Sequence, residues 1–197
     1  MEDSIKHEDT IKHIVRYMIQ DPVFKSAITE ELNNYENQNQ KCFLYQGDNC
    51  KIKIDNDNRI FLPDYNAELK IASYQAKSLY LFYLLLPYRV SNKQLHHYES
   101  ILITIYKEIC NYKICDDYRA GSVIQGMLKR ESGISDATNK IKKALKGIIQ
   151  DELLMKQYII DGPRYGERYI LLPKQSIYIE NKGLNVIKEQ ILHTNLI

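Results

Sequence analysis

The chain has no tryptophan, and few of its 197 residues are glycine (8), proline (5) or cysteine (4). Four cysteines over this length do not make the dense disulfide framework of a small secreted domain. The strongest apolar run, LYLFYLLLP at residues 79–87, is too short to span a bilayer. The polar, acidic start MEDSIKHEDT lacks the basic and apolar regions of a signal peptide. We therefore expect a cytoplasmic protein without a membrane partner.

The sequence also lacks the common motifs of enzymes. We find no Walker loop, G-x-G-x-x-G, nucleophile elbow or H-E-x-x-H. His96 and His97 are adjacent, so on a helix their side chains point about 100° apart and cannot easily share a metal ion. The stretch CNYKIC at residues 110–115 lacks the second Cys/His pair of a zinc site. We expect no catalysis, no cofactor and no metal.

Charge is unevenly distributed, although the net charge is only +2. Residues 1–72 hold 9 Lys/Arg against 13 Asp/Glu, whereas residues 119–174 hold 11 against 6. This asymmetry favours an acidic front and a basic back face. A solvated basic surface without a partner would give the same count.

Hydrophobic spacing and turn residues predict an α+β protein in three parts. Residues 1–40 form an N-terminal helical segment, with helices over 4–19 and 21–32. Residues 41–180 contain a β-meander of three short strands within residues 42–63, followed by a mainly helical module. Residues 181–197 form a C-terminal helix.

The module begins with two predicted helices, Ser73–Leu86 and Ser91–Ile109, with Val90 as a short extended bridge between them. The first is apolar on most faces and is therefore expected at the centre of the core. Three glycines make a long helix over residues 111–134 unfavourable. A third helix, Ser135–Ile149, precedes a predicted hairpin at residues 157–173, and SIYIE at residues 176–180 predicts a last strand.

The third helix separates apolar from polar residues. Its apolar arc contains Ala137, Ile141, Ala144, Leu145 and Ile148, and the opposite arc contains Asn139, Lys142, Lys143 and Lys146. The hairpin that follows carries Arg164 and Arg168 at and near its turn. A cationic helix followed by a basic hairpin is what a winged-helix DNA-binding protein needs. A solvated lysine face followed by a structural hairpin is the alternative.

The order of elements resembles the winged-helix effector domain of the OmpR/PhoB type. The segments ATNKIKKAL and QYIIDGPRYGERYIL are similar to the recognition helix and wing of that family. About residues 42–179 also resemble a set of bacterial proteins without an assigned activity. Two features depart from these patterns: about 25 residues link the second and third helices, and Lys140 replaces an arginine.

The resemblance implies a winged-helix-like module with three helices and a hairpin wing, which binds nucleic acid and regulates transcription. In this hypothesis Asn139, Lys142, Lys143 and Lys146 face double-stranded DNA, while Arg164 and Arg168 bind phosphate. The rival hypothesis is a non-enzymatic protein-interaction module on the same scaffold, with a protein partner or a homodimer. Its surface would be the acidic N-terminal helices or the tyrosine strip of Tyr80, Tyr83, Tyr88 and Tyr98. For most of these tyrosines, a core or boundary position is the preferred interpretation.

Overall fold

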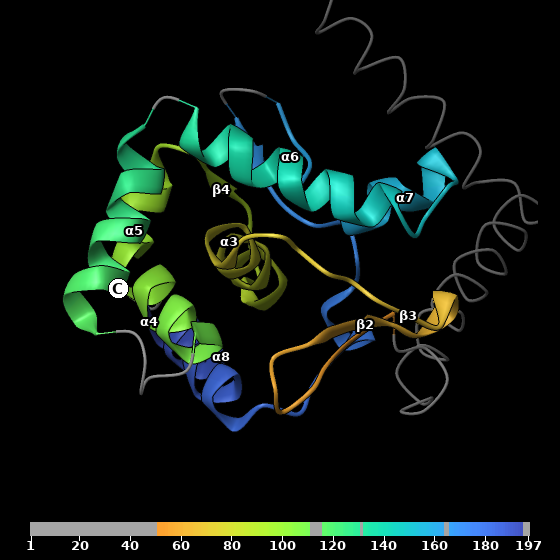
Figure 1. Cartoon of the computed structure of the whole chain (residues 1–197), viewed down its shortest axis with the longest axis horizontal. Coiled ribbons are helices and arrows are strands. Elements are labelled where there is room, and N and C mark those ends of the chain that lie inside the picture. Colours follow the sequence, from red (N-terminus) through yellow and green to blue (C-terminus); the bar gives the residue numbers. More distant parts are fainter. Residues whose placement is uncertain (1–50, 111–115, 131, 164–165, 195–197) are drawn as a thin grey trace, which may run out of the picture. The chain divides into compact units, whose positions relative to one another are not determined.

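The computed structural model describes residues 51–110, 116–130, 132–163 and 166–194, and it shows a mixed α+β fold (Figure 1). Residues Cys50–Ile197 form one compact unit. The helices predicted at residues 4–19 and 21–32, the strand predicted at 42–45 and the boundary near residue 40 lie outside the described residues. In the described ranges, no helix has the length and apolar character needed to cross a membrane.

In chain order the elements are β1 (Ile52–Ile54), β2 (Ile60–Leu62), η1 (Pro63–Tyr65), β3 (Ala67–Glu68), α3 (Tyr74–Leu85), β4 (Val90–Ser91), η2 (Gln94–Tyr98), α4 (Glu99–Cys110), α5 (Asp117–Lys129), α6 (Gly133–Lys146), α7 (Glu152–Tyr158), β5 (Glu167–Arg168), η3 (Lys174–Ser176), β6 (Ile177–Ile179) and α8 (Lys182–Thr194), where η marks a 3-10 helix.

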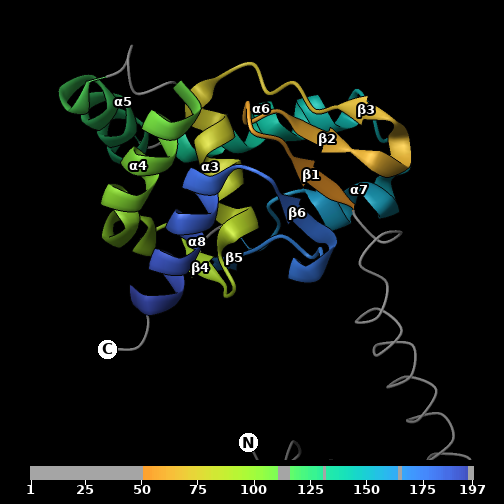
Figure 2. The ribbon, with the colours of Figure 1, turned by 90° about the horizontal axis from the view of Figure 1, so that it is seen from below.

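The strands of a four-stranded sheet lie side by side in the order β3-β2-β1-β6 (Figure 2). β1 and β2 form an antiparallel hairpin, as the alternation of apolar residues predicts, with Ile54 opposite Ile60. β6 confirms the strand predicted at the end of the module, and it pairs parallel with β1 so that Ile177 lies opposite Ile52. The apolar side chains of one sheet face are buried, namely Ile52, Ile54, Ile60, Leu62 and Ile177.

The turn between β1 and β2 is built on Asp55. Its carboxylate accepts hydrogen bonds from the backbone N–H of Asp57 (3.0 Å) and Arg59 (2.8 Å) and from Nε of Arg59 (2.7 Å). Asn58 adopts a left-handed φ of 61°, which asparagine tolerates. Burial raises the pKa of Asp55, but the hydrogen bonds and charge of Arg59 outweigh it and the pKa is lowered. The DNDN stretch is therefore the turn that its residues predict.

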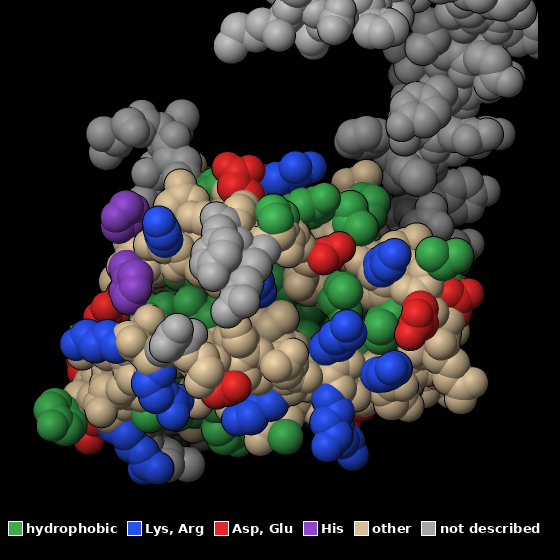
Figure 3. Space-filling view, turned by 90° about the horizontal axis from the view of Figure 1, so that it is seen from above, with side chains coloured by type: hydrophobic (Ala, Val, Ile, Leu, Met, Phe, Trp, Pro, Cys, Tyr) green, Lys and Arg blue, Asp and Glu red, His purple; other side chains and the backbone are tan. Residues whose placement is uncertain are grey.

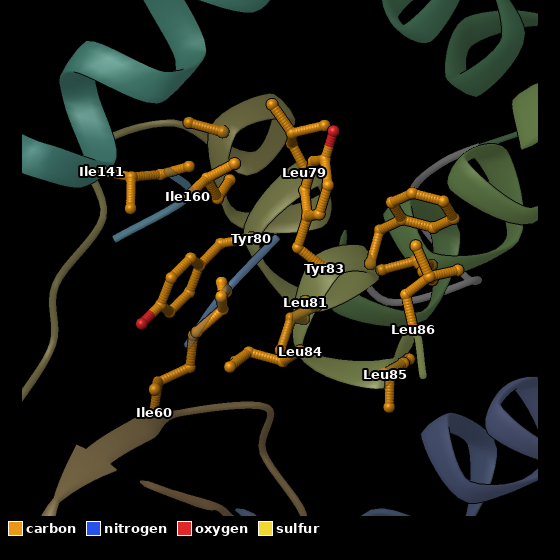
Figure 4. Packing of buried hydrophobic residues seen from close by; sticks show 14 of the residues in the cluster. Ile60, Leu79, Tyr80, Leu81, Tyr83, Leu84, Leu85, Leu86, Ile141 and Ile160 are labelled. Atoms are coloured by element: carbon orange, nitrogen blue, oxygen red, sulfur yellow. The ribbon is translucent and has the colours of Figure 1, made fainter. Parts of the chain in front are cut away.

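Helix α3 occupies the centre of the core, as predicted from its apolar faces. Ser73 is its N-cap, and the Ser73 hydroxyl accepts from the N–H of Ala76 (3.4 Å). Side chains from all sides of α3 are buried and point toward α6, β2 and the segment at Ile160 (Figure 4). Tyr80 is fully buried, and its hydroxyl donates to the carbonyl of Tyr158 (2.9 Å). Because buried hydroxyl groups need a partner, this bond ties α3 to α7.

The segment predicted to lack a long helix contains α5, so that prediction is wrong. Asp116 caps α5 by accepting from the N–H of Arg119 (2.7 Å). The apolar residues of α5 recur at helical spacing and are buried against α3, α4 and α6: Ala120, Ile124, Met127 and Leu128. This tertiary burial offsets the propensity cost of Gly121 and Gly126, which is about 1 kcal/mol each.

Helix α6 confirms the third predicted helix but begins earlier. Its N-cap is Ser132, not Ser135, and its last helical residue is Lys146 rather than Ile149. The second predicted helix likewise begins with a 3-10 turn, η2, before α4 starts at Glu99. Such differences at helix ends do not change which side of α6 is buried.

The hairpin predicted at residues 157–173 is shorter than its sequence suggests. Residues Glu152–Tyr158 form α7, because Asp151 caps that helix through the N–H groups of Leu153 (2.8 Å) and Leu154 (3.2 Å). The two arms pair through the bridge between Asp161 and Tyr169 and through a bond from the N–H of Leu172 to the carbonyl of Gln157 (3.2 Å). The side chains expected on its inner face are buried: Tyr158, Ile160, Ile170 and Leu172.

The outer arm of the hairpin pairs with a distant segment. β5 runs antiparallel to β4, with Arg168 opposite Val90 and Glu167 opposite Ser91. The extended bridge predicted at Val90 is therefore confirmed, and it joins the chain after α3 to the hairpin after α7. At the C-terminus, α8 confirms the last predicted helix and packs against α4.

Candidate nucleic-acid interface

Helix α6 presents the predicted polar residues to solvent. Asn139, Lys142, Lys143 and Lys146 are all exposed. The opposite side of the helix buries Ala137, Ile141 and Leu145 at 4%, 1% and 0% exposure. Lys140, which the sequence placed beside the apolar stripe, is also exposed. The separation of faces expected from a 3.6-residue period is thus present, and the exposed face is cationic.

The lysines of this face have no ion-pair partner within the described residues. Some cations elsewhere in the same unit do form ion pairs: Lys53 with Glu180 (2.7 Å), and Arg59 with Asp55 (2.7 Å) and Asp57 (3.4 Å). On α6, the one acidic side chain, Asp136, accepts from the hydroxyl of Ser132 (2.9 Å). The ammonium groups of α6 are therefore available for an anion from outside the chain.

Helices α5 and α6 are joined by a short connection, residues 130–132, and run in different directions (Figure 1). Gly133 begins α6, and a Cβ at this position would lie 2.1 Å from the carbonyl oxygen of Met127. The close approach of α6 to the last turn of α5 therefore requires glycine. Helices α5 and α6 are therefore joined by three residues, with glycine at the first position of the second helix.

Of the two predicted hairpin arginines, Arg168 lies within the described residues and Arg164 does not. Arg168 is half-buried on β5, and its Nε atom is buried without a hydrogen-bond partner in the described part of the chain. Burial raises the pKa of the neighbouring Tyr83, and the charge of Arg168 opposes that rise. Arg168 therefore lies toward the core side of the ribbon rather than at its tip.

A third arginine near the hairpin was missed by the sequence interpretation. Arg89 is exposed, and its guanidinium lies 4.1 Å from the centroid of the Tyr169 ring. This cation–π contact holds a cationic group beside the base of the hairpin. The pairing of β4 with β5 creates the contact, so nothing in the local sequence around Arg89 predicts it.

Basic side chains gather on one face of the protein. Figure 3 views it from above Figure 1, where Lys and Arg side chains form a band across the lower half, interrupted by single acidic side chains. The exposed basic residues of α5, the turn and α6 are Arg119, Lys129, Arg130, Lys140, Lys142, Lys143 and Lys146. The basic excess noted in the sequence is therefore concentrated on the α5–α6 pair.

Two other candidate sites in the described residues, a groove beside α5 and a metal site, lack the side chains that they would need. A groove of about 550 Å³ beside α5 is lined by Ile103, Gly121 and Gly126, with Asp117 and Lys129 as its charged groups. Asp117 is already ion-paired with Lys107. In the described ranges, no three His, Cys, Asp or Glu side chains lie close enough to hold a metal ion. His96 and His97 are exposed on η2.

The tyrosine strip is not a surface. Tyr80 and Tyr83 are buried in the core, at 0% and 1% exposure, and Tyr88 and Tyr98 are half-buried. They are therefore core or boundary residues, as preferred from the sequence, and the alternative that they form one exposed interaction surface does not fit their burial. Tyr80 and Tyr83 lie on α3, which is buried on every side, and Tyr88 and Tyr98 follow it in the chain.

Comparison with protein-family models, with curated proteins and with solved structures gives no match. The resemblance noted from sequence patterns therefore stays a prediction.

Proposed function

We propose that this chain is a nucleic-acid-binding protein that docks the α5–α6 pair on duplex DNA, with a role in transcriptional regulation. The observation that carries the proposal is the exposed cationic face of α6, next to a three-residue turn from α5. In helix-turn-helix proteins the second helix lies in the major groove. Here α6 takes that position.

The short turn supports the proposal because it removes an objection that the sequence raised. A 25-residue link before α6 would be too long for a helix-turn-helix. Since α5 fills most of that link, residues 130–132 are what separates the two helices. The antiparallel pairing of β4, which follows α3, with the second arm of the hairpin after α6 also supports the winged-helix hypothesis. α7 is additional to that pattern, and so is one of the four helices α3 to α6, because the predicted module has three helices before its wing.

The side chains of α6 define what it reads. Lys142, Lys143 and Lys146 carry point charges that contact phosphates without distinguishing bases. Asn139 is the group on this face that can make a bidentate contact to adenine in the major groove. Affinity is therefore strongly salt-dependent, and selectivity is concentrated at the base pair that faces Asn139.

The test is binding of the full chain to random duplex DNA across a salt series. We expect log K to fall linearly with log salt, by about 0.9 per phosphate contact. The double variant Lys142→Ala/Lys143→Ala should bind roughly ten- to a hundredfold more weakly at moderate salt, with a slope reduced by about 2.

The control is Lys70→Ala/Lys182→Ala, which removes the same charge from two exposed positions outside α6. It should leave the slope unchanged. No binding by the wild type even at low salt contradicts the proposal, and an equal loss in both double variants contradicts the assignment to α6.

One observation supports the rival function, a protein-interaction module. Among the exposed large hydrophobic residues, three leucines lie on or beside α7 rather than on the basic face.

A further inference from the structure

The exposed side of α6 changes in character along the helix. At about 100° per residue, five other exposed side chains lie within about 60° of Asn139 around the helix axis: Ser135, Asp136, Lys142, Lys143 and Lys146. The three lysines belong to the second half of α6, whereas the first half carries the hydroxyl, the carboxylate and the amide. In helix-turn-helix proteins the N-terminal residues of the second helix contact base edges. In that position the first half of α6 faces bases and the second half faces phosphates.

Asp136 is the acidic side chain of this exposed face. Its Oδ2 atom accepts from the hydroxyl of Ser132 (2.9 Å), and this bond limits the orientations of the carboxylate. Within the described ranges it forms no ion pair. A carboxylate that faces DNA is repelled by the phosphates, so it weakens binding wherever the base edge opposite it has no donor. Asp136 is therefore a group that penalises most base pairs.

The chemistry of a carboxylate matches one base in the major groove. A carboxylate accepts hydrogen bonds and does not donate them. Guanine presents two acceptors there, thymine presents an acceptor and a methyl group, and adenine places the acceptor N7 beside the donor N6. Cytosine presents the N4 donor alone. An acceptor-only side chain is therefore attracted to cytosine and meets a repelling acceptor on each of the other bases.

We propose that Asp136 is a specificity-determining residue that accepts from N4 of a cytosine, at the base pair next to the one that faces Asn139. This inference rests on the proposed function and adds a second base pair to it. Asp136 and Asn139 are three residues apart, or about 4.5 Å along the helix axis. That spacing fits successive base pairs, which are about 3.4 Å apart. The preferred duplex therefore contains a C·G pair next to an A·T pair.

Asp136 also has a local role that must be separated from base reading. It lies in the first turn of α6, where a carboxylate interacts favourably with the helix dipole. Loss of that interaction lowers the stability of the helix but does not change which base is preferred. The measurement is therefore the base preference at one position of the bound duplex.

The experiment selects bound sites from duplexes with about ten randomised base pairs, roughly one helical turn, using the full chain. The wild type should enrich a C·G pair next to an A·T pair, and replacement of that cytosine should weaken binding roughly tenfold. Asp136→Asn keeps the size of the side chain and an oxygen that can accept from the Ser132 hydroxyl. Because a carboxamide makes two hydrogen bonds to adenine, the preferred base at this position should change from cytosine to adenine.

The control is Glu189→Gln, which removes one negative charge from an exposed position on α8 and should keep the wild-type preference. Circular dichroism checks that each variant is folded. A wild type that binds duplexes without preferring cytosine next to an A·T pair overturns this inference and leaves the proposed function standing. So does an Asp136→Asn variant with the wild-type preference. A wild type that binds no duplex even at low salt overturns both.

Discussion

At the scale of single residues, two glycines of the α5–α6 pair have opposite effects on its stability. Gly133 is required by a close approach, since a Cβ there would lie 2.1 Å from the Met127 carbonyl oxygen. A Cβ at Gly126 would meet nothing within 4 Å. The helix pair that forms the candidate interface is therefore held together by one glycine and weakened by the other.

The two glycines therefore predict substitutions of opposite sign. Gly133→Ala forces the α5–α6 turn to shift and should lower the free energy of unfolding by about 2 kcal/mol. Gly126→Ala fills open space on α5 and should raise it by up to about 1 kcal/mol. Urea unfolding followed by circular dichroism measures both. Equal effects of the two substitutions would show that the turn does not depend on the missing side chain at Gly133.

At the scale of elements, the sequence predicts those whose stability comes from their own pattern. Helix α3 follows from its Ser73 cap and apolar faces, the β1–β2 turn follows from the carboxylate of Asp55, and the exposed face of α6 follows from helical spacing. α5 does not follow, because its glycines are offset by burial against three other helices. The parallel pairing of β6 with β1 and the half-burial of Arg168 likewise depend on distant segments.

The segment Glu152–Tyr158 shows how a local cap decides between helix and strand. The sequence pattern assigns part of it to a strand, because Tyr158 starts an alternating apolar run. Glu, Leu, Met, Lys and Gln favour a helix, and the Asp151 carboxylate satisfies two backbone N–H groups at its start. The helix then ends where the buried alternation at Tyr158 begins.

Removal of this cap gives an element-scale prediction. Asp151→Ala should lower the free energy of unfolding by about 1 kcal/mol, because two N–H groups lose their acceptor. Asp151→Asn keeps an oxygen that can accept these bonds and should cost much less. Thermal unfolding of the two variants is the measurement. A loss of the same size in both would mean that the charge of Asp151, and not its capping bonds, stabilises α7.

At the scale of the whole molecule, burial shifts the pKa values of titratable groups on and beside α3 in opposite directions. Burial lowers the pKa of Lys174 to about 8, and its ammonium donates to the carbonyl groups of Tyr83 (2.9 Å) and Leu84 (3.2 Å) at the end of α3. Burial raises the pKa of Tyr80, and it raises that of Tyr158 to about 12. The native state therefore binds fewer protons than the unfolded chain at the pH where Lys174 titrates. It binds more protons than the unfolded chain at the higher pH where free tyrosines titrate.

The consequence is a stability maximum in the alkaline range. Between pH 8 and the usual lysine pKa of 10.5, unfolded Lys174 binds a proton that the native state has lost, so stability rises with pH. Above the usual tyrosine pKa of 10.0, the unfolded tyrosines release protons that the native state keeps, so stability falls toward pH 12.

Urea midpoints measured from about pH 7 to about pH 11.5 test this profile. Lys174→Met keeps the buried stem and removes the ammonium, and it should reduce the rise to the part that Lys77 contributes, because burial also lowers the pKa of Lys77. The fall above the usual tyrosine pKa of 10.0 should stay in place. A wild-type midpoint that declines steadily from pH 8 would contradict the account.

The parallel pairing of β1 with β6 has a further consequence for how the protein is made. Ile52 lies opposite Ile177, so the sheet joins the first and last parts of the compact unit. During synthesis, β1, β2 and β3 leave the ribosome long before β6, and β1 has an unfilled hydrogen-bonding edge for that whole interval. Helices α3 to α6 make neighbouring contacts and can associate earlier, because short loops cost less entropy to close. The sheet is therefore completed only after most of the compact unit has been translated.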